Sequence, residues 1–213
     1  SNFLVNYARG NTALSVTIAA FSMSGSILFT PFNLAFWGAL NPDTRPILHA
    51  VALSPWEVLG AVVVLLGIPT TLGIWVSHRY PSFAARARRP FQVLSLVFFV
   101  LFVLGALAVN WDFFLKYTHR VVLFVFLLNA FALMTGYYTA RAFRLPEGDR
   151  RAVSLEVGIQ NSGFGLALVF NFFGGLGGMA IVAAWWGIWH ILAGLTVSTW
   201  WRRHPPLPAG ATT

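Results

Sequence analysis

The stretch AVSLEVGIQNSGFGLALVFNFF, residues 152–173, is as long and apolar as a membrane-spanning helix but carries Glu156, Gln160 and Asn161 in its middle. About 20 mostly apolar residues are enough to cross a bilayer as a helix. Polar groups at that depth must face protein or a water-filled cavity, because hydrocarbon offers them no hydrogen-bond partner. Gly158 and Gly163 lie beside these residues and allow the backbone to leave the helical path. We therefore predict that this helix breaks near residues 160–163.

The rest of the chain predicts an all-α, polytopic membrane protein with about six full transmembrane helices. Of the 213 residues, 57% are hydrophobic and 9% are charged, and the mean hydropathy is +0.71. Soluble domains carry about 25% charged residues. Ser54, Pro55 and Glu57 form a helix-start signal, and Pro31 and Pro69 are expected to kink their helices. The other five spans are predicted at residues 12–40, 55–76, 91–109, 120–140 and 181–201.

The basic residues alternate between the two ends of these predicted spans. If the C-terminus lies in the cytoplasm, eleven of the 14 Lys and Arg residues fall on the cytoplasmic side, and only Arg45, Lys116 and Arg120 fall on the other side. This asymmetry follows the positive-inside rule and predicts an integral, multi-pass cell-membrane protein with a cytoplasmic C-terminus. The net charge of +8 does not indicate nucleic-acid binding, because the basic residues form short clusters between apolar runs.

The chain is expected to form a single membrane transporter domain over residues 1–213. Its last ten residues, 204–213, read HPPLPAGATT and predict a disordered cytoplasmic tail. The first residues, SNFLVNYAR, have the character of a broken-helix stub that continues an earlier segment, so we expect an N-terminal truncation. Cysteine is absent, which excludes disulfides and thiolate metal sites within this chain. The sequence does not indicate an oligomeric state.

Glu156 is the acidic residue that lies deepest in an apolar segment. A carboxylate in a bilayer costs at least about 2.5–3.5 kcal/mol and therefore indicates a functional site. Gln160 lies one helical turn further on the same face, and unwinding would free the carbonyl groups of Val157 and Ile159. Such an all-oxygen set suits a hard cation, and a single carboxylate favours a singly charged ion such as sodium. The stub at Ser1 and Asn2, followed by Ser15 in a new helix, repeats the pattern of an interrupted helix.

Several other interpretations remain open from the residues alone. Glu156 lies five residues after Arg151, so it can also sit near the interface and pair with an arginine. A proton-coupled carrier that uses Glu156, a non-transporting membrane sensor and a channel are alternatives. An intramembrane enzyme would need a second titratable group near Glu156, for which only His190 is available, and we expect no enzymatic activity. A histidine in a Trp-rich helix is equally well a packed, hydrogen-bonded residue.

Three strings resemble sequence signatures of the bile acid:sodium symporter family. Residues 1–16, SNFLVNYARGNTALSV, are similar to its fourth-to-fifth helix region, and residues 155–163, LEVGIQNSG, are similar to the ninth-helix signature E-V-G-x-Q-N-S-G. Trp189 and His190 resemble the W-H pair of its tenth helix. The resemblance implies that the chain supplies helices four/five to ten of a ten-helix, inverted-repeat transporter with core and panel domains. It also implies sodium-coupled symport of an organic anion, bile-acid-like or smaller, by alternating access.

The resemblance further implies two sodium sites and a substrate cavity. The first sodium site would use Ser1, Asn2, Ser15 and Glu156, and Ala19 stands where many family members have a hydroxyl ligand. The second would use Glu156, Gln160 and the carbonyl groups of Val157 and Ile159, together with a residue from a preceding helix. Asn161 and His190 match positions that line the substrate cavity, and Ile191 stands where some members have Asn. The expected partners are two sodium ions, a small organic anion and the lipid bilayer.

Overall fold

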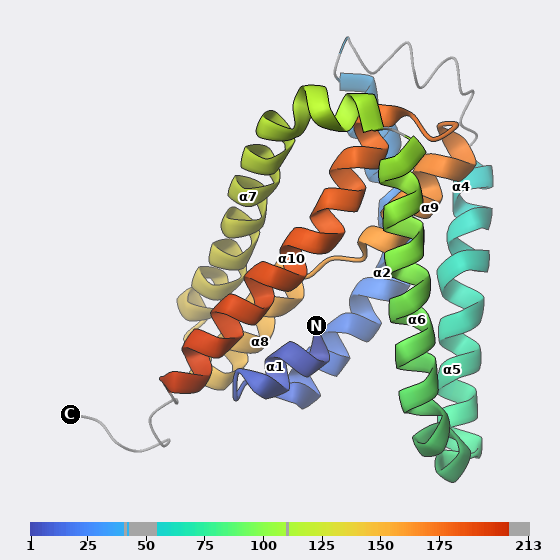
Figure 1. The fold of residues 1–213 in the computed structure, drawn as a ribbon. Helices are drawn as coiled ribbons and strands as arrows, with labels where there is room; N and C mark the ends of the chain where they lie inside the picture. The colour runs from blue at the N-terminus through green and yellow to red at the C-terminus, as the bar shows by residue number, and fades with distance from the viewer. Residues whose placement is uncertain (41, 43–54, 110, 205–213) are drawn as a thin grey trace.

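The structure, a computed structural model, describes residues 1–40, 42, 55–109 and 111–204 (Figure 1). Within these ranges the chain is helical and has no strand, which confirms the all-α prediction. The helices are α1 (Asn2–Tyr7), α2 (Thr12–Leu40), α4 (Pro55–Val62), the π-helical turn η1 (Val63–Gly67), α5 (Ile68–Arg79), α6 (Pro81–Val109), α7 (Trp111–Ala142), α8 (Glu147–Gly158), α9 (Ser162–Phe172) and α10 (Gly177–Arg203). Ser54, the predicted cap of the second span, and residues 205–213 of the predicted tail lie outside the described residues.

Five stretches of the described helices are long and apolar enough to cross a membrane, so the protein is an integral, multi-pass membrane protein. They are Thr12–Leu40, Leu59–Arg79, His119–Ala142, Glu147–Phe172 and Gly177–Arg203. Each corresponds to one of the predicted spans, and the sixth, residues 91–109, forms the second part of helix α6. Large apolar side chains such as Phe21, Phe98 and Phe131 stay exposed on these helices, as a lipid-facing surface requires.

The two helices that were expected to kink at Pro31 and Pro69 continue through these prolines. Helix α2 includes Pro31 without interruption. Before Pro69 the helix adopts the π-helical turn η1 and then continues as α5. Proline has no backbone N–H, so Pro69 cannot bond the carbonyl four residues earlier, and a π-helical turn is one way in which a helix accommodates such a lost bond.

The predicted break in the 152–173 segment is present, and it separates α8 from α9 at residues 159–161. Ile159 leaves the helix in an extended conformation, with φ −102° and ψ 96°. Asn161 begins the next helix, where its side chain accepts a hydrogen bond from the backbone N–H of Phe164 at 3.1 Å. The break lies slightly earlier than predicted, and both Gly158 and Gly163 are helical rather than unwound. The polar side chains, and not the glycines, therefore mark the broken segment itself.

A second interruption separates α1 from α2 and brings α1 against the start of α8. The backbone N–H of Asn11 donates to the carbonyl of Gly148 at 2.9 Å, and its side chain donates to Asp149 Oδ1 at 2.8 Å. A side chain on Gly10 would come within 2.9 Å of Val5 Cγ1 and 3.3 Å of the Gly148 carbonyl oxygen, so only glycine fits this close approach. The C-terminal end of α1 is therefore fixed against the start of α8.

Helix α7 packs closely along α8 through two glycines. A Cβ atom on Gly136 would lie 2.8 Å from Ser154 Cα, and one on Gly158 would lie 2.3 Å from Leu133 Cδ2. Ser154 Oγ also donates to the Leu133 carbonyl across this interface at 2.7 Å. Small residues that allow backbones to approach are the usual basis of helix association in membranes. Helix α7 thus supports the half-helix that carries Glu156.

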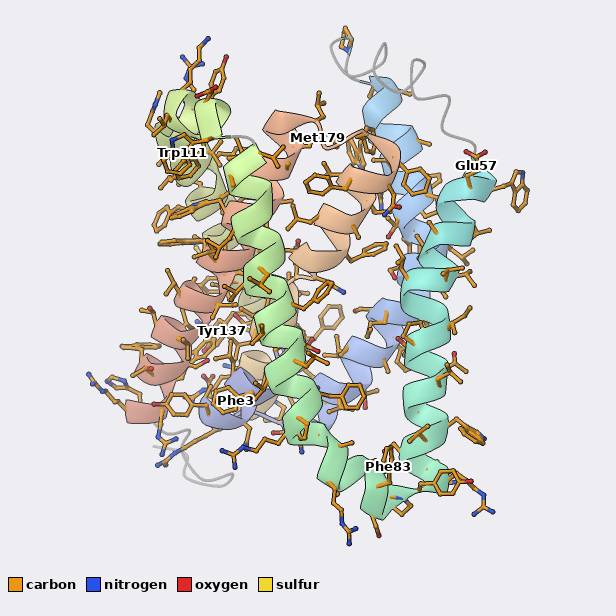
Figure 2. The ribbon with its side chains drawn as sticks, turned by 45° about the vertical axis from the view of Figure 1, so that its right-hand side comes forward. Phe3, Glu57, Phe83, Trp111, Tyr137 and Met179 are labelled. Carbon is orange, nitrogen blue, oxygen red and sulfur yellow. The ribbon has the colours of Figure 1, made fainter. Side chains whose placement is uncertain are left out.

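The arginine clusters lie at one end of the helices, as the charge alternation predicts (Figures 1 and 2). In Figure 2, Phe83 marks the elbow between α5 and α6, at the end opposite Glu57, Trp111 and Met179. The C-terminal ends of α7 and α10, helix α1 and the start of α8 lie at the same end as this elbow (Figure 1). The basic residues of these segments are Arg9, Arg79, Arg86, Arg88, Arg89, Arg141, Arg144, Arg150, Arg151, Arg202 and Arg203.

Candidate functional site

Three polar side chains from three helices meet close to the break between α8 and α9. Ser15, in the first turn of α2, is fully buried. Its Oγ atom lies 2.6 Å from Asn2 Oδ1, at the start of α1, and also contacts Glu156 Oε1, near the end of α8. Helices α1, α2 and α8 therefore each contribute one side-chain oxygen to the same cluster. The sequence suggested these three residues, and the structure brings them together.

The cluster has more acceptor oxygens than protons. The hydroxyl of Ser15 carries one hydrogen, which can serve either Asn2 Oδ1 or Glu156 Oε1 but not both. An ionised Glu156 carboxylate brings no proton of its own. If Glu156 is ionised, one of the two contacts therefore lacks a proton and the negative charge of the carboxylate is uncompensated, and a small cation or a proton on Glu156 would supply the positive charge. Hard cations prefer such oxygens, and the described residues contain no group of three His, Asp or Glu side chains that could hold a metal ion.

Backbone carbonyl groups are exposed to this region where α8 ends. The Val157 carbonyl accepts only the side-chain N–H of Gln160, at 3.3 Å, and the Ile159 carbonyl accepts no hydrogen bond from any residue that the structure describes. The Gly158 carbonyl between them is bonded by Asn129 Nδ2 of α7 at 2.7 Å. The break thus leaves the Ile159 carbonyl without a partner among the described residues and the Val157 carbonyl with only a long contact from the Gln160 side chain.

Two pockets meet at the broken segment, and Gln160 and Asn161 line both. The first has a volume of about 520 Å³ and lies between α2 and the α8–α9 break. Its lining residues are Ser1, Ile18, Ala19, Ser22, Met23, Ser26, Glu156, Val157, Ile159, Gln160, Asn161 and Phe164. The second, of about 480 Å³, lies between α9 and the first half of α10 and includes Trp186. Glu156 therefore borders a space large enough for a small organic molecule.

Comparison with known proteins shows which family the chain belongs to. The profile of the sodium bile acid symporter family matches residues 1–117, more than half of the chain. The chain belongs to the sodium bile acid symporter family.

Curated relatives align with 76–97% of the chain but extend well beyond it. An uncharacterized sodium-dependent transporter of Bacillus subtilis, YocS, is 26% identical over 203 residues, which cover 95% of this chain and 60% of that protein. The probable chloroplastic sodium/metabolite cotransporter BASS1 of Arabidopsis thaliana is 25% identical over 97% of this chain and 49% of its own length. Sodium/bile acid cotransporter 5 of Rattus norvegicus is 28% identical over 76% of this chain and 36% of its own length. The chain thus spans about half the length of these proteins.

The remaining candidate residues of this symporter chain lie around the cluster without hydrogen bonds to it. Ser1 is exposed and lines the same pocket as Glu156. Ala19 lines that pocket too, so the missing hydroxyl leaves the pocket wall apolar at this point. His190 is buried on α10 at 5% exposure, its Nδ1 atom has no hydrogen-bond partner among the described residues, and it lines neither of the two pockets. Ile191 is exposed.

Two further residues support this site. As a polar residue inside an apolar span, Asn129 was a candidate for an interhelical hydrogen bond, and its side chain bonds the Gly158 carbonyl at the end of α8. Arg151 appeared only as a topology signal, yet it is 3% exposed and bonds three backbone carbonyl groups. The sequence signal for a role of Arg151 was its position five residues before an intramembrane glutamate. Its carbonyl partners could not be inferred from this, because they come from distant parts of the chain.

Replacement of Asn129 by alanine is expected to destabilise the symporter fold. The substitution leaves the buried Gly158 carbonyl without its donor, which costs about 1–3 kcal/mol. The free energy of unfolding, measured by denaturant titration in detergent, should fall by this amount. Asn171→Ala is the matched control, because Asn171 is exposed and bonds only the Ala167 carbonyl of its own helix. Equal effects of the two substitutions would show that Asn129 does not hold the end of α8.

Proposed function

We propose that this protein is a sodium-coupled secondary symporter that carries an organic anion by alternating access. The observation that supports the proposal most directly is the contact of the Ser15 hydroxyl, which has only one hydrogen, with oxygens of both Asn2 and Glu156. A sodium ion at this point would neutralise the carboxylate and fix the three helices that contribute the oxygens. Membership of the family and the sodium-dependent transporters among its relatives favour sodium as the ion.

We assign two sodium sites on the two sides of Glu156. The first uses Ser1, Asn2, Ser15 and Glu156, which is the side of the oxygen cluster. The second uses Glu156, Gln160 and the carbonyl groups of Val157 and Ile159, which is the side of the helix break. Val157 and Ile159 retain carbonyl oxygens that no backbone N–H occupies, and this supports their use as ligands.

The substrate is assigned to the pockets at the break, with Asn161 as a polar contact. Lys and Arg are absent from the described residues that line either pocket, so no basic side chain there would balance an anionic substrate. Bound sodium and the N-terminal end of α9 would supply the positive potential instead. His190 is a second substrate contact only if α10 moves relative to the break, because the residue is buried in this conformation.

Coupling follows from electrostatics at Glu156. Without a cation, the ionised carboxylate opposes closure of α1, α2 and α8 around it. Binding of sodium favours the conformation that binds the anion, and by thermodynamic reciprocity the anion then raises the affinity for sodium by the same factor. The basic end of the helices is assigned to the cytoplasm on the positive-inside rule.

A proton-coupled carrier is the second candidate, and the same oxygen cluster favours it. A protonated Glu156 would donate to Ser15, which would then donate to Asn2, so every contact in the cluster would have a proton. Uptake driven by an imposed pH gradient in the absence of sodium would support this candidate. Uptake driven by a sodium gradient at equal pH on the two sides would exclude it.

Replacement of Ser15 by alanine tests the proposed sodium site. The substitution removes the oxygen that contacts both Asn2 and Glu156, so the sodium concentration for half-maximal uptake should rise about tenfold or more. Uptake by the full-length protein in proteoliposomes, measured against sodium concentration, provides the value. Ser24→Ala, on the exposed surface of the same helix, is the control and should leave the value unchanged. An unchanged sodium dependence in Ser15→Ala would remove this cluster from the mechanism.

A further inference from the structure

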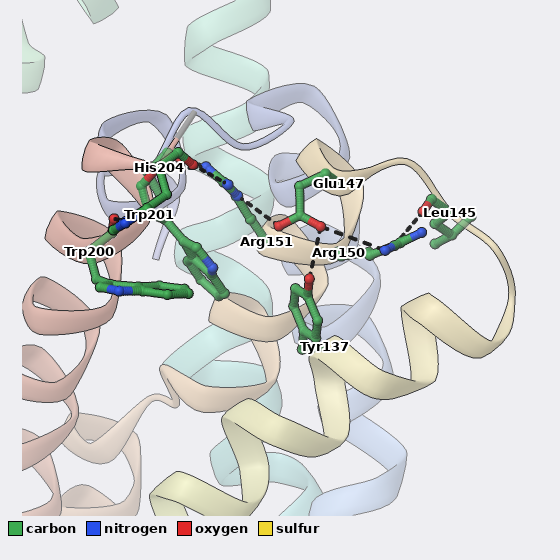
Figure 3. Close-up of polar contacts among 9 residues, drawn as sticks. Tyr137, Leu145, Glu147, Arg150, Arg151, Trp200, Trp201 and His204 are labelled. Atoms are coloured by element: carbon green, nitrogen blue, oxygen red, sulfur yellow. Dashed lines mark hydrogen bonds and ion pairs between the residues drawn. The ribbon is translucent and has the colours of Figure 1, made fainter. Parts of the chain in front are cut away.

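Arg151 is a buried arginine of α8 whose guanidinium group connects three helices, α1, α8 and α10 (Figure 3). Its NH1 group donates to the carbonyl oxygens of Ala8, at 2.9 Å, and Trp201, at 3.0 Å. NH2 donates to the His204 carbonyl at 2.7 Å, and Nε donates to Glu147 Oε1 at 3.1 Å. The side chain also lies over the Trp201 ring. One side chain of α8 thus binds the C-terminal ends of α1 and α10.

The chemistry of these contacts requires arginine. Four of the five N–H donors of the guanidinium group are used, and they point in fixed directions. The last carbonyl groups of a helix have no partner within the helix and carry partial negative charge, so a cation at this position satisfies them. Lysine has the same charge but only three donors on one nitrogen, so it cannot serve all four acceptors.

The contact between Arg151 and Ala8 affects the oxygen cluster because α1 and α8 are joined at two places, by this contact and by the cluster itself. Ala8 is the C-terminal cap of α1, and Asn2 is the first residue of that six-residue helix. Arg151 and Glu156 lie on the same helix, α8. Ser15 connects Asn2 with Glu156, and so joins the N-terminal end of α1 to the C-terminal part of α8. The position of α1 against α8 is therefore fixed at one end by Arg151 and at the other by the site itself.

We propose that Arg151 is a positioning residue for the cation site. By holding the C-terminal end of α1 against α8, it places Asn2 at the distance from Glu156 that the cation requires. The inference rests on the proposed sodium site and adds a residue that contacts neither the ion nor the substrate. Leu4, Val5, Ala8, Ala152 and Leu155 pack into one apolar cluster around this contact, so the guanidinium group acts within a rigid region.

The substitution Arg151→Lys, with Arg150→Lys as its control, tests the proposal. Both variants keep the net charge, and Arg150 is half-buried, bonds the Leu145 carbonyl at 2.6 Å and forms no bond to α1 or α10. Arg151→Lys should raise the sodium concentration for half-maximal uptake by about tenfold, with the maximal rate within about twofold. Arg150→Lys should change neither value. A folded Arg151→Lys protein with unchanged sodium dependence would overturn the proposal.

A disulfide rescue separates positioning from a general loss of structure. The chain has no cysteine, and the side chains of Asn11 and Asp149 are in contact between the α1–α2 junction and α8. Asn11→Cys with Asp149→Cys would tie these segments together upon oxidation. In the Arg151→Lys background, oxidation should restore the parental sodium dependence, and reduction should remove it again. A crosslinked Arg151→Lys protein that still requires about tenfold more sodium would contradict the proposal. The same result would count against it if Arg151→Lys folds only when it is crosslinked.

The outcomes distinguish this inference from the proposed function itself. If Ser15→Ala leaves sodium dependence unchanged, the cation site is wrong and the role of Arg151 falls with it. If Ser15→Ala weakens sodium dependence and Arg151→Lys does not, the site stands and only the positioning role fails.

Discussion

Glu156→Gln abolishes sodium-driven uptake while the protein stays folded; this is the largest functional effect that we expect. The substitution keeps the shape of the side chain and removes the negative charge that a bound cation compensates. Loss of one partner from such a pair in a low-dielectric site is worth several kcal/mol, so the affinity for sodium should fall at least about a hundredfold. Gln160→Ala should also abolish sodium-dependent uptake, because it removes an oxygen of the second site.

Thermal unfolding with and without sodium shows whether Glu156→Gln acts through the ion. In the parent protein, sodium should raise the midpoint of unfolding, because it binds only the folded state. In Glu156→Gln this sodium-induced increase should disappear, whereas the midpoint without sodium should stay equal or rise, since the uncompensated charge is gone. Glu57→Gln, an exposed carboxylate at the opposite end of the helices, should keep the full response. Normal sodium-driven uptake by Glu156→Gln would contradict the mechanism.

Gly136→Ala prevents correct packing of α7 against α8, and we expect it to have the largest effect on stability. The added Cβ atom would lie 2.8 Å from Ser154 Cα and 2.9 Å from the Val153 carbonyl oxygen. Both neighbours belong to the backbone, so the clash cannot be relieved by rotation of a side chain. Overpacking costs of about 3 kcal/mol or more follow when two helices must separate. The yield of monodisperse protein in detergent and its thermal midpoint should both fall.

Gly73→Ala provides the control for this packing prediction. It introduces the same methyl group into a helix, at a site where no atom lies within 4 Å. Alanine is favoured over glycine in a helix by about 1 kcal/mol, so this variant should be as stable as the parent or slightly more stable. A Gly136→Ala protein as stable as Gly73→Ala would show that α7 and α8 are not in such close contact.

The polar residues of the 152–173 segment were sufficient to predict the broken helix. Glu156, Gln160 and Asn161 cannot face lipid, and the chain leaves the helix where the last two occur. The break lies between Gly158 and Gly163, as expected, but Gly158 itself stays helical, and its missing side chain makes room for Leu133 of α7. A single sequence cannot separate these two uses of glycine, because the second depends on which helix packs against the position.

The supporting contacts of the site could not be predicted, because they join distant parts of the chain. Arg151 bonds a residue 143 positions before it and others 50 and 53 positions after it. Neither the charge pattern nor the helical periodicity predicts contacts between residues so far apart in the sequence. The meeting of Asn2, Ser15 and Glu156 was expected from the resemblance to the symporter family, and the composition alone would have given only an intramembrane carboxylate.

The bonds of Arg151 would limit how the helices can move in the proposed transport cycle. Sliding of α1 or α10 past α8 would withdraw carbonyl groups from a guanidinium group that water does not reach. In the proposed transport cycle, the ends of α1 and α10 that meet at Arg151 would therefore move together with the start of α8, and larger rearrangements would occur elsewhere in the fold. The π-helical turn ahead of Pro69, where the regular bonding of the helix is already altered, is a natural hinge for that purpose.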